Sequence, residues 1–430
     1  CDLFYKDKWV NVMKIDVMRK VAYFFGVPLC FLATGFFRFI CLFNRRKSEY
    51  PRKVLFIELS EMGSTILVDP AMRKMREKGN AELYFLIFKA NVASLYLLNT
   101  VPRTNIFVIR EDRFLNLVMD TFRFLVWVRR RGIDTVIDLE LFSRYTALLT
   151  GLSGAVNRIG FHAFYNEGLY RGEMLTHRVA YNPHLHIAKN FIALVNTALA
   201  GKEELPFSKT LITDSEIDLV KAEVSESALS AMNDRIRGEY PDYDEKHFRI
   251  VLINPNASDL LPQRRWMPDH FVAVMRGLLA DNENLLVLIT GSPAERDEAE
   301  GLKQRVGSER CVNFAGCLSL QELPALYQIA EVMLTNDSGP GHFSSVTNLR
   351  TFVIFGPETP RLYGSLGNST PIYAGLACSP CVSAANHRKT PCVDNVCLRV
   401  IEPEMVLERL REALKENVAL KENVSRDGVV

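Results

Sequence analysis

Short apolar runs recur along the chain and alternate with longer stretches in which apolar residues follow helical spacing. In the first half, runs of strand length lie at 54–59, 83–88, 106–109 and 135–139, and helical spacing covers 66–78, 114–131 and 186–200. The runs lack the polar alternation of a sheet with one wet face, which favours parallel strands covered on both sides. Strands that alternate with helices predict a doubly wound sheet.

The same alternation restarts in the second half. Strands are predicted at 249–253, 285–289, 332–335 and 351–355, with helices at 268–279, 295–306, 319–329 and 404–416. Ser319, with Glu322 three residues later, has capping-box spacing. The fold class is therefore α/β, with two doubly wound, Rossmann-like domains that we expect to face each other across a cleft. The last helix is expected to pack back on the first domain.

The chain is too long for one ordinary core, because it has 430 residues. We expect a basic and apolar membrane-associating segment at 1–50, a first Rossmann-like domain at 51–205 and a second at 248–402. Between them, the charged stretch 206–247 is predicted to be a linker with a helix near 214–224. A C-terminal helix and tail would occupy 403–430.

The segment 21–43 is almost wholly apolar, with Arg38 as its only charge. Basic residues flank it on both sides, whereas a spanning helix has a positive excess mainly on the cytoplasmic side. The break at Gly26-Val27-Pro28 and these symmetric flanks favour a segment that dips into one leaflet or lies on it. A true span and a buried core helix remain open. We expect contact with the inner-membrane surface.

Composition narrows the classes of partner. The 48% hydrophobic and 24% charged residues describe an ordered globular protein. The formal net charge of +2 gives no argument for nucleic acid, so none is expected as a partner.

The stretch around Asn336-Asp337-Ser338-Gly339-Pro340-Gly341 carries the candidate chemistry. It follows a predicted strand, and His342 is expected to open a helix directly after the turn. A strand, a glycine turn and a helix start present backbone N–H groups and a positive dipole end to an anion, typically a phosphate.

Several sequence blocks together resemble the heptosyltransferases of glycosyltransferase family nine, which have the GT-B fold. The matching residues are Asn336 to His342 with Phe355-Gly356-Pro357, and upstream Asn254 to Ser258 with Arg264-Arg265-Trp266. Thr290 to Glu295, Asn313 to Gly316, 59–70 and Arg158 to Phe161 also match, the last two more loosely. The likeness covers roughly 53–402, and the N-terminal apolar segment lies outside it.

The resemblance implies an inverting glycosyltransferase that moves a sugar from a nucleotide donor to a lipid-linked saccharide, such as the lipopolysaccharide core. An ADP-sugar with a heptose-like group is favoured, and no cofactor or metal is required at the reaction centre. The first domain would hold the acceptor and the second the nucleotide sugar. The localisation this implies is the cytoplasmic face of the bacterial inner membrane.

The resemblance places the donor in the second domain. The amides of Ser338, Gly339 and Gly341 and the fork of Arg264 would stabilise the diphosphate. Asp337 would accept hydrogen bonds from sugar hydroxyls, or else cap the following helix. His342 either approaches the diphosphate or packs, Glu295 either touches the ribose or base or begins a helix, and Asn256 and Ser258 lie on a loop suited to the donor.

The catalytic base cannot be carried over from the family directly. The family usually has an aspartate as the base, and this chain has Ser64 at that position. Serine cannot take a proton from a hydroxyl at neutral pH without a separate base. Glu61, on the same acceptor-side loop as Gly63 and Ser64, is the favoured substitute, and Asp138 is a second candidate. The base has moved, the acceptor differs, or catalysis has been lost.

That last option keeps a second function open, a non-catalytic GT-B protein that binds a sugar nucleotide or glycolipid as an assembly or regulatory subunit. A GT-B epimerase ranks below both. Separately, Cys378, Cys381, Cys392 and Cys397 form a group with a spacing suited to structural zinc, although disulfides and plain thiols are alternatives.

Overall fold

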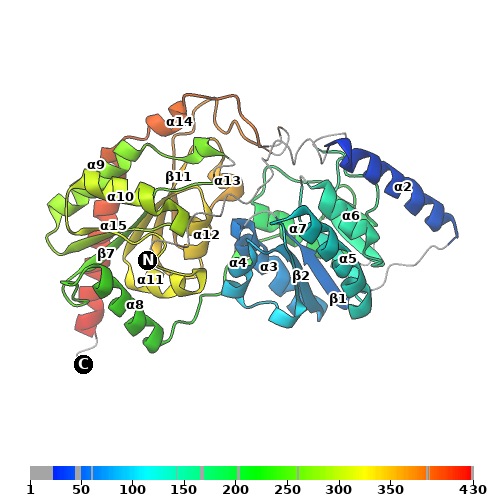
Figure 1. Cartoon of the computed structure of the whole chain (residues 1–430), viewed down its shortest axis with the longest axis horizontal. Helices are drawn as coiled ribbons and strands as arrows, with labels where there is room; N and C mark the ends of the chain where they lie inside the picture. Colours follow the sequence, from blue (N-terminus) through cyan, green and yellow to red (C-terminus); the bar gives the residue numbers. More distant parts are fainter. Residues whose placement is uncertain are drawn as a thin grey trace. The chain divides into compact units, whose positions relative to one another are not determined.

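The computed structural model describes residues 23–43, 50–59, 62–141, 143–164, 169–200, 204–258, 261–383, 386 and 388–427 (Figure 1). The chain divides into two compact units. The N-terminal unit runs up to Ile217, and the C-terminal unit contains the residues from Asp218 to Ser383 and from Lys389 onward. Each unit is built on its own parallel sheet, as the alternating pattern predicts.

The N-terminal sheet has six described strands in the order β3-β2-β1-β4-β5-β6, all paired in parallel. The strands are β1 Lys53–Ile57, β2 Glu82–Phe88, β3 Ile106–Ile109, β4 Thr135–Asp138, β5 Asn157–Phe161 and β6 His177–Val179. The first four were predicted from their apolar runs. β5 and β6 were not, because both carry charged or polar residues within the strand and β6 has only three residues.

Helices cover this sheet and connect its strands. They are α2 Gly26–Phe43, α3 Met62–Gly79, α4 Val92–Leu98, η1 Arg103–Asn105, α5 Phe114–Arg131, α6 Arg144–Leu152, α7 Ile187–Leu199 and η2 Ser215–Ile217. The predicted helices 66–78, 114–131 and 186–200 are confirmed. The helix expected near 214–224 is wrong, because only η2 forms in that stretch and the next helix begins at Glu226.

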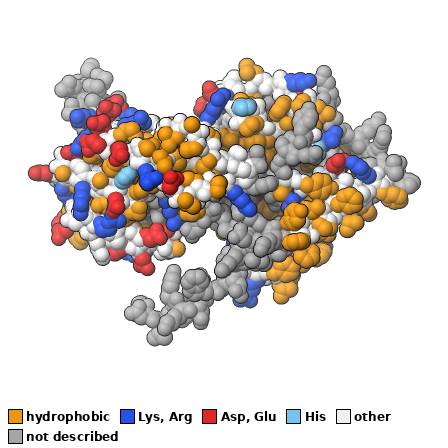
Figure 2. All heavy atoms as spheres, turned by 90° about the horizontal axis from the view of Figure 1, so that it is seen from above, with side chains coloured by type: hydrophobic (Ala, Val, Ile, Leu, Met, Phe, Trp, Pro, Cys, Tyr) orange, Lys and Arg blue, Asp and Glu red, His pale blue; other side chains and the backbone are white. Residues whose placement is uncertain are grey.

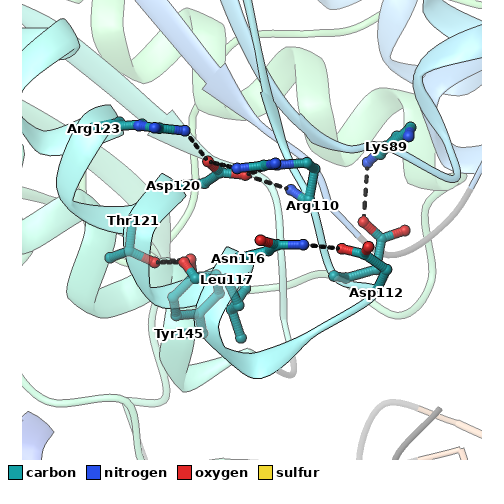
Figure 3. Close-up of polar contacts among 10 residues, drawn as sticks. Lys89, Arg110, Asp112, Asn116, Leu117, Asp120, Thr121, Arg123 and Tyr145 are labelled. Atoms are coloured by element: carbon teal, nitrogen blue, oxygen red, sulfur yellow. Dashed lines mark hydrogen bonds and ion pairs between the residues drawn. The ribbon is translucent and has the colours of Figure 1, made fainter. Parts of the chain in front are cut away.

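An ion-pair group fixes the turn from β3 into α5 (Figure 3). Asp120 accepts hydrogen bonds from the Arg110 side chain at 2.8 Å and from the Arg110 backbone N–H at 3.1 Å. Arg123, one helical turn along, adds a contact of 3.3 Å. These hydrogen bonds, led by those from Arg110, lower the pKa of the Asp120 carboxyl to about 2. The carboxylate is therefore ionised at neutral pH, and it clamps the end of β3 to α5.

The prediction of an N-terminal membrane segment is corrected by α2. Among the described residues, no helix is both long enough and apolar enough to cross a bilayer. α2 instead packs on α6, and Cys30 of α2 is buried with Ala147 and Met174. Thr34 is also buried, and its hydroxyl accepts the Glu173 N–H at 2.9 Å. The face of α2 that carries Cys30 and Thr34 is thus buried against the rest of this unit.

The C-terminal sheet repeats the design with the order β12-β11-β10-β7-β8-β9, again all parallel. Its strands are β7 Arg249–Asn254, β8 Leu285–Ile289, β9 Cys311–Asn313, β10 Val332–Asn336, β11 Arg350–Phe355 and β12 Ser369–Tyr373. β7, β8, β10 and β11 were predicted. β9 was missed because only three residues form it, and β12 was missed because it contains polar residues and a proline.

The other elements of this unit are α8 Glu226–Glu239, η3 Pro262–Arg264, α9 Pro268–Asp281, η4 Pro293–Glu295, α10 Arg296–Val306, η5 Leu320–Glu322, α11 Leu323–Ile329, α12 Gly339–Ser344, α13 Pro360–Tyr363, α14 Val396–Arg399 and α15 Pro403–Asp427. The capping box of Ser319 and Glu322 is present at the start of η5. α15 packs against α9 inside the C-terminal core, with Leu410 and Leu414 buried, so the expectation that it packs on the first domain is wrong.

Both sheets reverse their strand order at one place. In the N-terminal sheet the reversal lies between β1 and β4, and in the C-terminal sheet it lies between β7 and β10. Ligands of doubly wound sheets bind outside the carboxyl ends of the strands at such a reversal. The two positions are therefore where candidate chemistry is sought.

Candidate active site

The loops that leave β7, β8 and β10 are tied together at the reversal of the C-terminal sheet. Asn336, the last residue of β10, donates its amide N–H to the Pro255 carbonyl at 2.7 Å and accepts the Trp266 backbone N–H at 3.0 Å. Asn254, the last residue of β7, donates to the Thr290 carbonyl at 3.1 Å. Strand-end amides thus hold the predicted donor loops against one another.

Arg264 lies between two buried carboxylates at this position. Its Nε is 3.6 Å from the Asp337 carboxylate, and a terminal nitrogen is 3.4 Å from the Glu358 carboxylate. A second terminal nitrogen donates to the Asp337 carbonyl at 3.4 Å. These contacts are longer than the 2.7–2.9 Å of a strong charge-assisted bond, and the Arg264 Nε has no hydrogen-bond partner among the described residues. The guanidinium is anchored and still has donor capacity for an anion.

The glycine turn opens a short helix, as predicted, but the helix starts earlier than His342. α12 begins at Gly339, and its N-cap is Ser338. Asp337 therefore does not occupy the N-cap position, so the alternative prediction that it caps this helix is wrong. A Cβ atom on Gly341 would lie 2.9 Å from the Ser365 Oγ and 3.2 Å from a Val353 methyl group, so this position requires glycine for close packing.

His342 is buried, and its Nδ1 lies 3.5 Å from the Ser365 Oγ. Glu295 completes a capping box with Ser292, whose N–H it accepts at 2.6 Å, so its helix-start role is present. Asn256 is buried beside the same turn, where its amide nitrogen would lie 2.8 Å from a Cβ on Gly291. Ser258 is exposed on the loop after β7.

The acceptor-side loop lies at the reversal of the N-terminal sheet, between β1 and β4. Gly63 and Ser64 form the first turn of α3, which begins at Met62 rather than at 66. Glu61 lies outside the described residues, so its role as the base stays a prediction. Its neighbour in sequence, Leu59, donates its N–H to the Glu140 carboxylate at 3.0 Å, which ties the end of β1 to the loop after β4.

Asp138 is at the carboxyl end of β4, as expected, but both of its carboxylate oxygens already accept hydrogen bonds. Arg171 donates to one carboxylate oxygen, and the Glu140 N–H donates to the other at 3.2 Å. Burial raises the pKa of Asp138, and the Arg171 guanidinium opposes that shift. A carboxylate held by an arginine in the protein interior is a weak candidate for the base.

Sequence reasoning missed three charged residues that the structure brings to these positions, namely Glu358, Glu140 and Arg171. Glu358 follows the recognised Gly356-Pro357 pair, and Glu140 lies two residues beyond the Asp138 candidate. A search for every ionisable residue within three positions of a predicted strand end would have found both. Arg171 lies far from any predicted strand, so no local signal identified it.

The four-cysteine group carries free thiols in the structure. Burial raises the pKa of the Cys397 thiol, and the charges of Cys381, Cys378 and Cys392 add to the shift. Within the described part of the chain, however, no three His, Cys, Asp or Glu side chains are arranged to hold a metal ion. The described residues thus do not form a zinc site in this structure, and the structural zinc suggested by the cysteine spacing is not supported.

Comparison with models of protein families shows which family this chain belongs to. The family model described as glycosyltransferase family 9 (heptosyltransferase) matches residues 122–390, more than half of the chain. The chain belongs to glycosyltransferase family 9. The match extends from α5 of the N-terminal unit through the loops of Asn256, Arg264 and Asp337 to the cysteine-bearing loop.

Individual family 9 relatives agree with this. The chain is 26% identical over 173 residues to a lipooligosaccharide heptosyltransferase 2 of Campylobacter jejuni, an alignment of 39% of this chain and 52% of the relative. It therefore spans about half the length of that relative. It is 21% identical over 332 residues to the lipopolysaccharide core heptosyltransferase OpsX of Haemophilus influenzae, covering 76% of this chain and 86% of the relative.

A solved structure confirms the fold. The ADP-heptose lipopolysaccharide heptosyltransferase II of Escherichia coli aligns with a TM-score of 0.64 and 18% identity, covering 85% of this chain and 99% of the other. The predicted GT-B-like architecture of two Rossmann-type sheets is therefore confirmed. The expected N-terminal membrane segment is not, because no helix in the described part of the chain could cross a bilayer.

Proposed function

We propose that this family 9 chain is an inverting glycosyltransferase that moves a heptose-like sugar from an ADP-sugar to a lipid-linked saccharide such as the lipopolysaccharide core. The observation that carries the proposal is the placement of Arg264, Asp337 and the glycine turn at the reversal of the C-terminal sheet. The names of the heptosyltransferase relatives support the choice of sugar and acceptor.

The chemistry follows from the charges at the site. When the sugar–phosphate bond breaks, negative charge grows on the departing diphosphate, so fixed positive groups lower the barrier. Arg264 supplies a guanidinium, whose planar fork matches the oxygen atoms of a diphosphate. The Asp337 carboxylate accepts hydrogen bonds from sugar hydroxyls and, with Glu358, holds Arg264 in place. Glu61 takes the proton from the acceptor hydroxyl as it attacks.

The donor is tested by thermal shift with ADP-heptose, UDP-glucose and GDP-mannose, followed by a transfer assay on deep-rough lipopolysaccharide. We expect ADP-heptose alone to raise the melting temperature, since a ligand that binds the folded state stabilises it, by about 2.7 kcal/mol at a hundredfold excess over Kd. Transfer should follow with the same donor. Equal shifts with all three nucleotides would contradict the assignment of the donor.

The rival function, a non-catalytic sugar-nucleotide or glycolipid binder, rests on Ser64 at the position where the family usually has its base. The thermal-shift and transfer assays described above distinguish the enzyme from the non-catalytic binder. A thermal shift without transfer or donor hydrolysis would establish the binder and overturn the enzyme.

We further propose that the N-terminal unit contacts the anionic surface of the inner membrane, on its cytoplasmic face, through α5. The solvent side of this helix exposes large apolar side chains, namely Phe114, Leu115, Met119, Phe122 and Val126. Arg123 is exposed beside them, and Arg129, Arg130 and Arg131 form the last turn. Figure 2 shows that hydrophobic side chains gather on the surface of this unit. Apolar side chains next to arginines suit an interface rich in anionic lipid.

Vesicle co-sedimentation tests this contact. The protein should pellet with vesicles containing about one third phosphatidylglycerol and stay in solution with pure phosphatidylcholine, because each basic residue near an anionic surface adds about 1 kcal/mol. Phe122→Asp should weaken binding about tenfold or more. Val220→Asp, a matched change at an exposed valine of the C-terminal unit, should not. Equal binding of both variants would contradict the assignment of α5.

A further inference from the structure

A cavity of about 460 Å³ opens in the N-terminal unit at the carboxyl ends of β4 and β5. Its wall contains Asp138, Phe161, His162, Phe164, Arg171 and Arg178. The carboxyl edge of a parallel sheet is where doubly wound folds bind ligands, and the volume falls within the range of small-molecule pockets. Asp138 and Arg171 of this wall were considered above only for the base, and no ligand has been assigned to the cavity itself.

Most charges in the cavity wall already have partners. Arg171 is paired with Asp138, and Glu173 is paired with Arg38 of α2. Arg178 differs, because no carboxylate lies within ion-pair distance of it among the described residues. Its guanidinium stands 6.0 Å from the centre of the Phe164 ring, and the His162 ring meets the edge of the same phenyl group at 5.0 Å. Within the described part of its wall, the cavity thus presents the Arg178 cation, without an ion-pair partner, beside aromatic faces.

This combination favours a particular ligand class. An arginine fork binds phosphate or carboxylate in a bidentate manner, and aromatic faces pack against the apolar face of a sugar ring. A neutral sugar or a purely apolar ligand would leave the Arg178 charge without a partner. A sugar that carries a phosphate or carboxylate satisfies both parts of the wall.

The loop that closes the cavity is positioned by α2. Thr34 of α2 accepts the Glu173 N–H at 2.9 Å. Gly172 lies against the same helix with φ +77°, and a Cβ there would be 2.7 Å from the Thr34 Oγ1 and 2.9 Å from the Cys30 carbonyl oxygen. Any side chain at 172 would therefore push the loop off α2. The backbone is also held from the α6 side, where Arg144 donates to the Tyr170 carbonyl at 2.8 Å.

From these contacts we infer that the cavity binds an anionic saccharide, the acceptor or a part of it, through Arg178, and that α2 positions the binding loop through Thr34. The inference rests on the proposed transferase function, which supplies the need for a saccharide at the N-terminal unit. It gives the apolar N-terminal helix a role in acceptor recognition.

Binding of small probes to the full chain tests the inference. Glucose 6-phosphate, glucuronate and glucose are compared by saturation-transfer NMR titration. We expect the two anionic sugars to bind and glucose to bind at least tenfold more weakly, because the anion supplies the charge-assisted bonds. The first two probes distinguish a phosphate-bearing from a carboxylate-bearing ligand.

Variants then assign the residues. Arg178→Gln should weaken binding of the anionic sugar about tenfold or more, and Arg178→Lys should recover part of it. Arg113→Gln, an exposed arginine outside the cavity wall, is the matched control. Thr34→Val should weaken the same binding several-fold, and Thr34→Ser should restore it. Melting curves of each variant show whether the fold is kept.

The ADP-heptose thermal shift of each variant separates this inference from the proposed function. A normal shift with lost sugar binding supports the cavity assignment. Undiminished binding of the anionic sugar by Arg178→Gln, or equal binding of glucose by the unmodified chain, would overturn the inference while leaving the donor site intact. If the unmodified chain shows no ADP-heptose shift, the transferase proposal fails by a different measurement.

Discussion

Glu61→Gln is expected to slow transfer by about 10²–10⁴-fold while ADP-heptose binds with unchanged affinity. Glutamine keeps the size and one acceptor oxygen of the side chain but cannot take up a proton. The loss should therefore appear in kcat, because the proposed donor site is formed by residues of the C-terminal unit. Single-turnover transfer and calorimetric titration of the donor measure the two quantities separately.

Two matched variants sharpen this experiment. Ser64→Ala should retain activity within several-fold, because serine is not the base. Asp138→Asn breaks the buried pair with Arg171, and removing one partner of such a pair costs about 3–5 kcal/mol of stability. Asp138→Asn should thus lower the melting temperature, which Glu61→Gln should not do. A folded Asp138→Asn protein without activity, beside an active Glu61→Gln protein, would move the base to Asp138.

Arg264→Gln is expected to lower kcat/KM by about 10²–10³-fold, the typical cost of removing one preplaced donor from a developing anion. The change also leaves the buried Asp337 and Glu358 carboxylates without their shared cation. Donor affinity should fall as well, because like charges then face the diphosphate. Steady-state kinetics with varied ADP-heptose and calorimetry of ADP binding report both effects.

The neighbouring residue provides the control. Arg265 directs its guanidinium to the Ala257 carbonyl at 2.8 Å and 3.1 Å, so Arg265→Gln should cost less than tenfold. Arg264→Lys keeps the charge and loses the fork, and it should retain most of the activity. An Arg264→Gln protein with normal turnover would show that the diphosphate is stabilised elsewhere.

The sequence was most informative where hydrophobic periodicity is strong. The buried runs of β1, β7, β8 and β10 have no polar interruptions, so their type and parallel pairing followed directly. β5 fails this criterion, because Arg158 lies within it and is recognised as a strand residue only through its pairing with β4. Short strands draw their stability from neighbours in the sheet, and local patterns do not contain that information.

The proximity of the predicted donor residues could also be foreseen, for a related reason. Asp337, Arg264 and Asn256 follow predicted strands, and all parallel strands end at the same edge. The partnership of Arg264 with Glu358 depends on side chains 94 positions apart, and it was not predicted. The apolar segment 21–43 was misread as a membrane element because hydropathy does not distinguish a lipid surface from a protein neighbour such as α6.

The amide of Asn336 holds the loop after β7 on one side and the backbone before α9 on the other. Because these hydrogen bonds fix the loops in place, the proposed nucleotide site should lose little conformational entropy on binding. We therefore expect Asn336 to raise the affinity of the proposed nucleotide site by fixing its loops in advance.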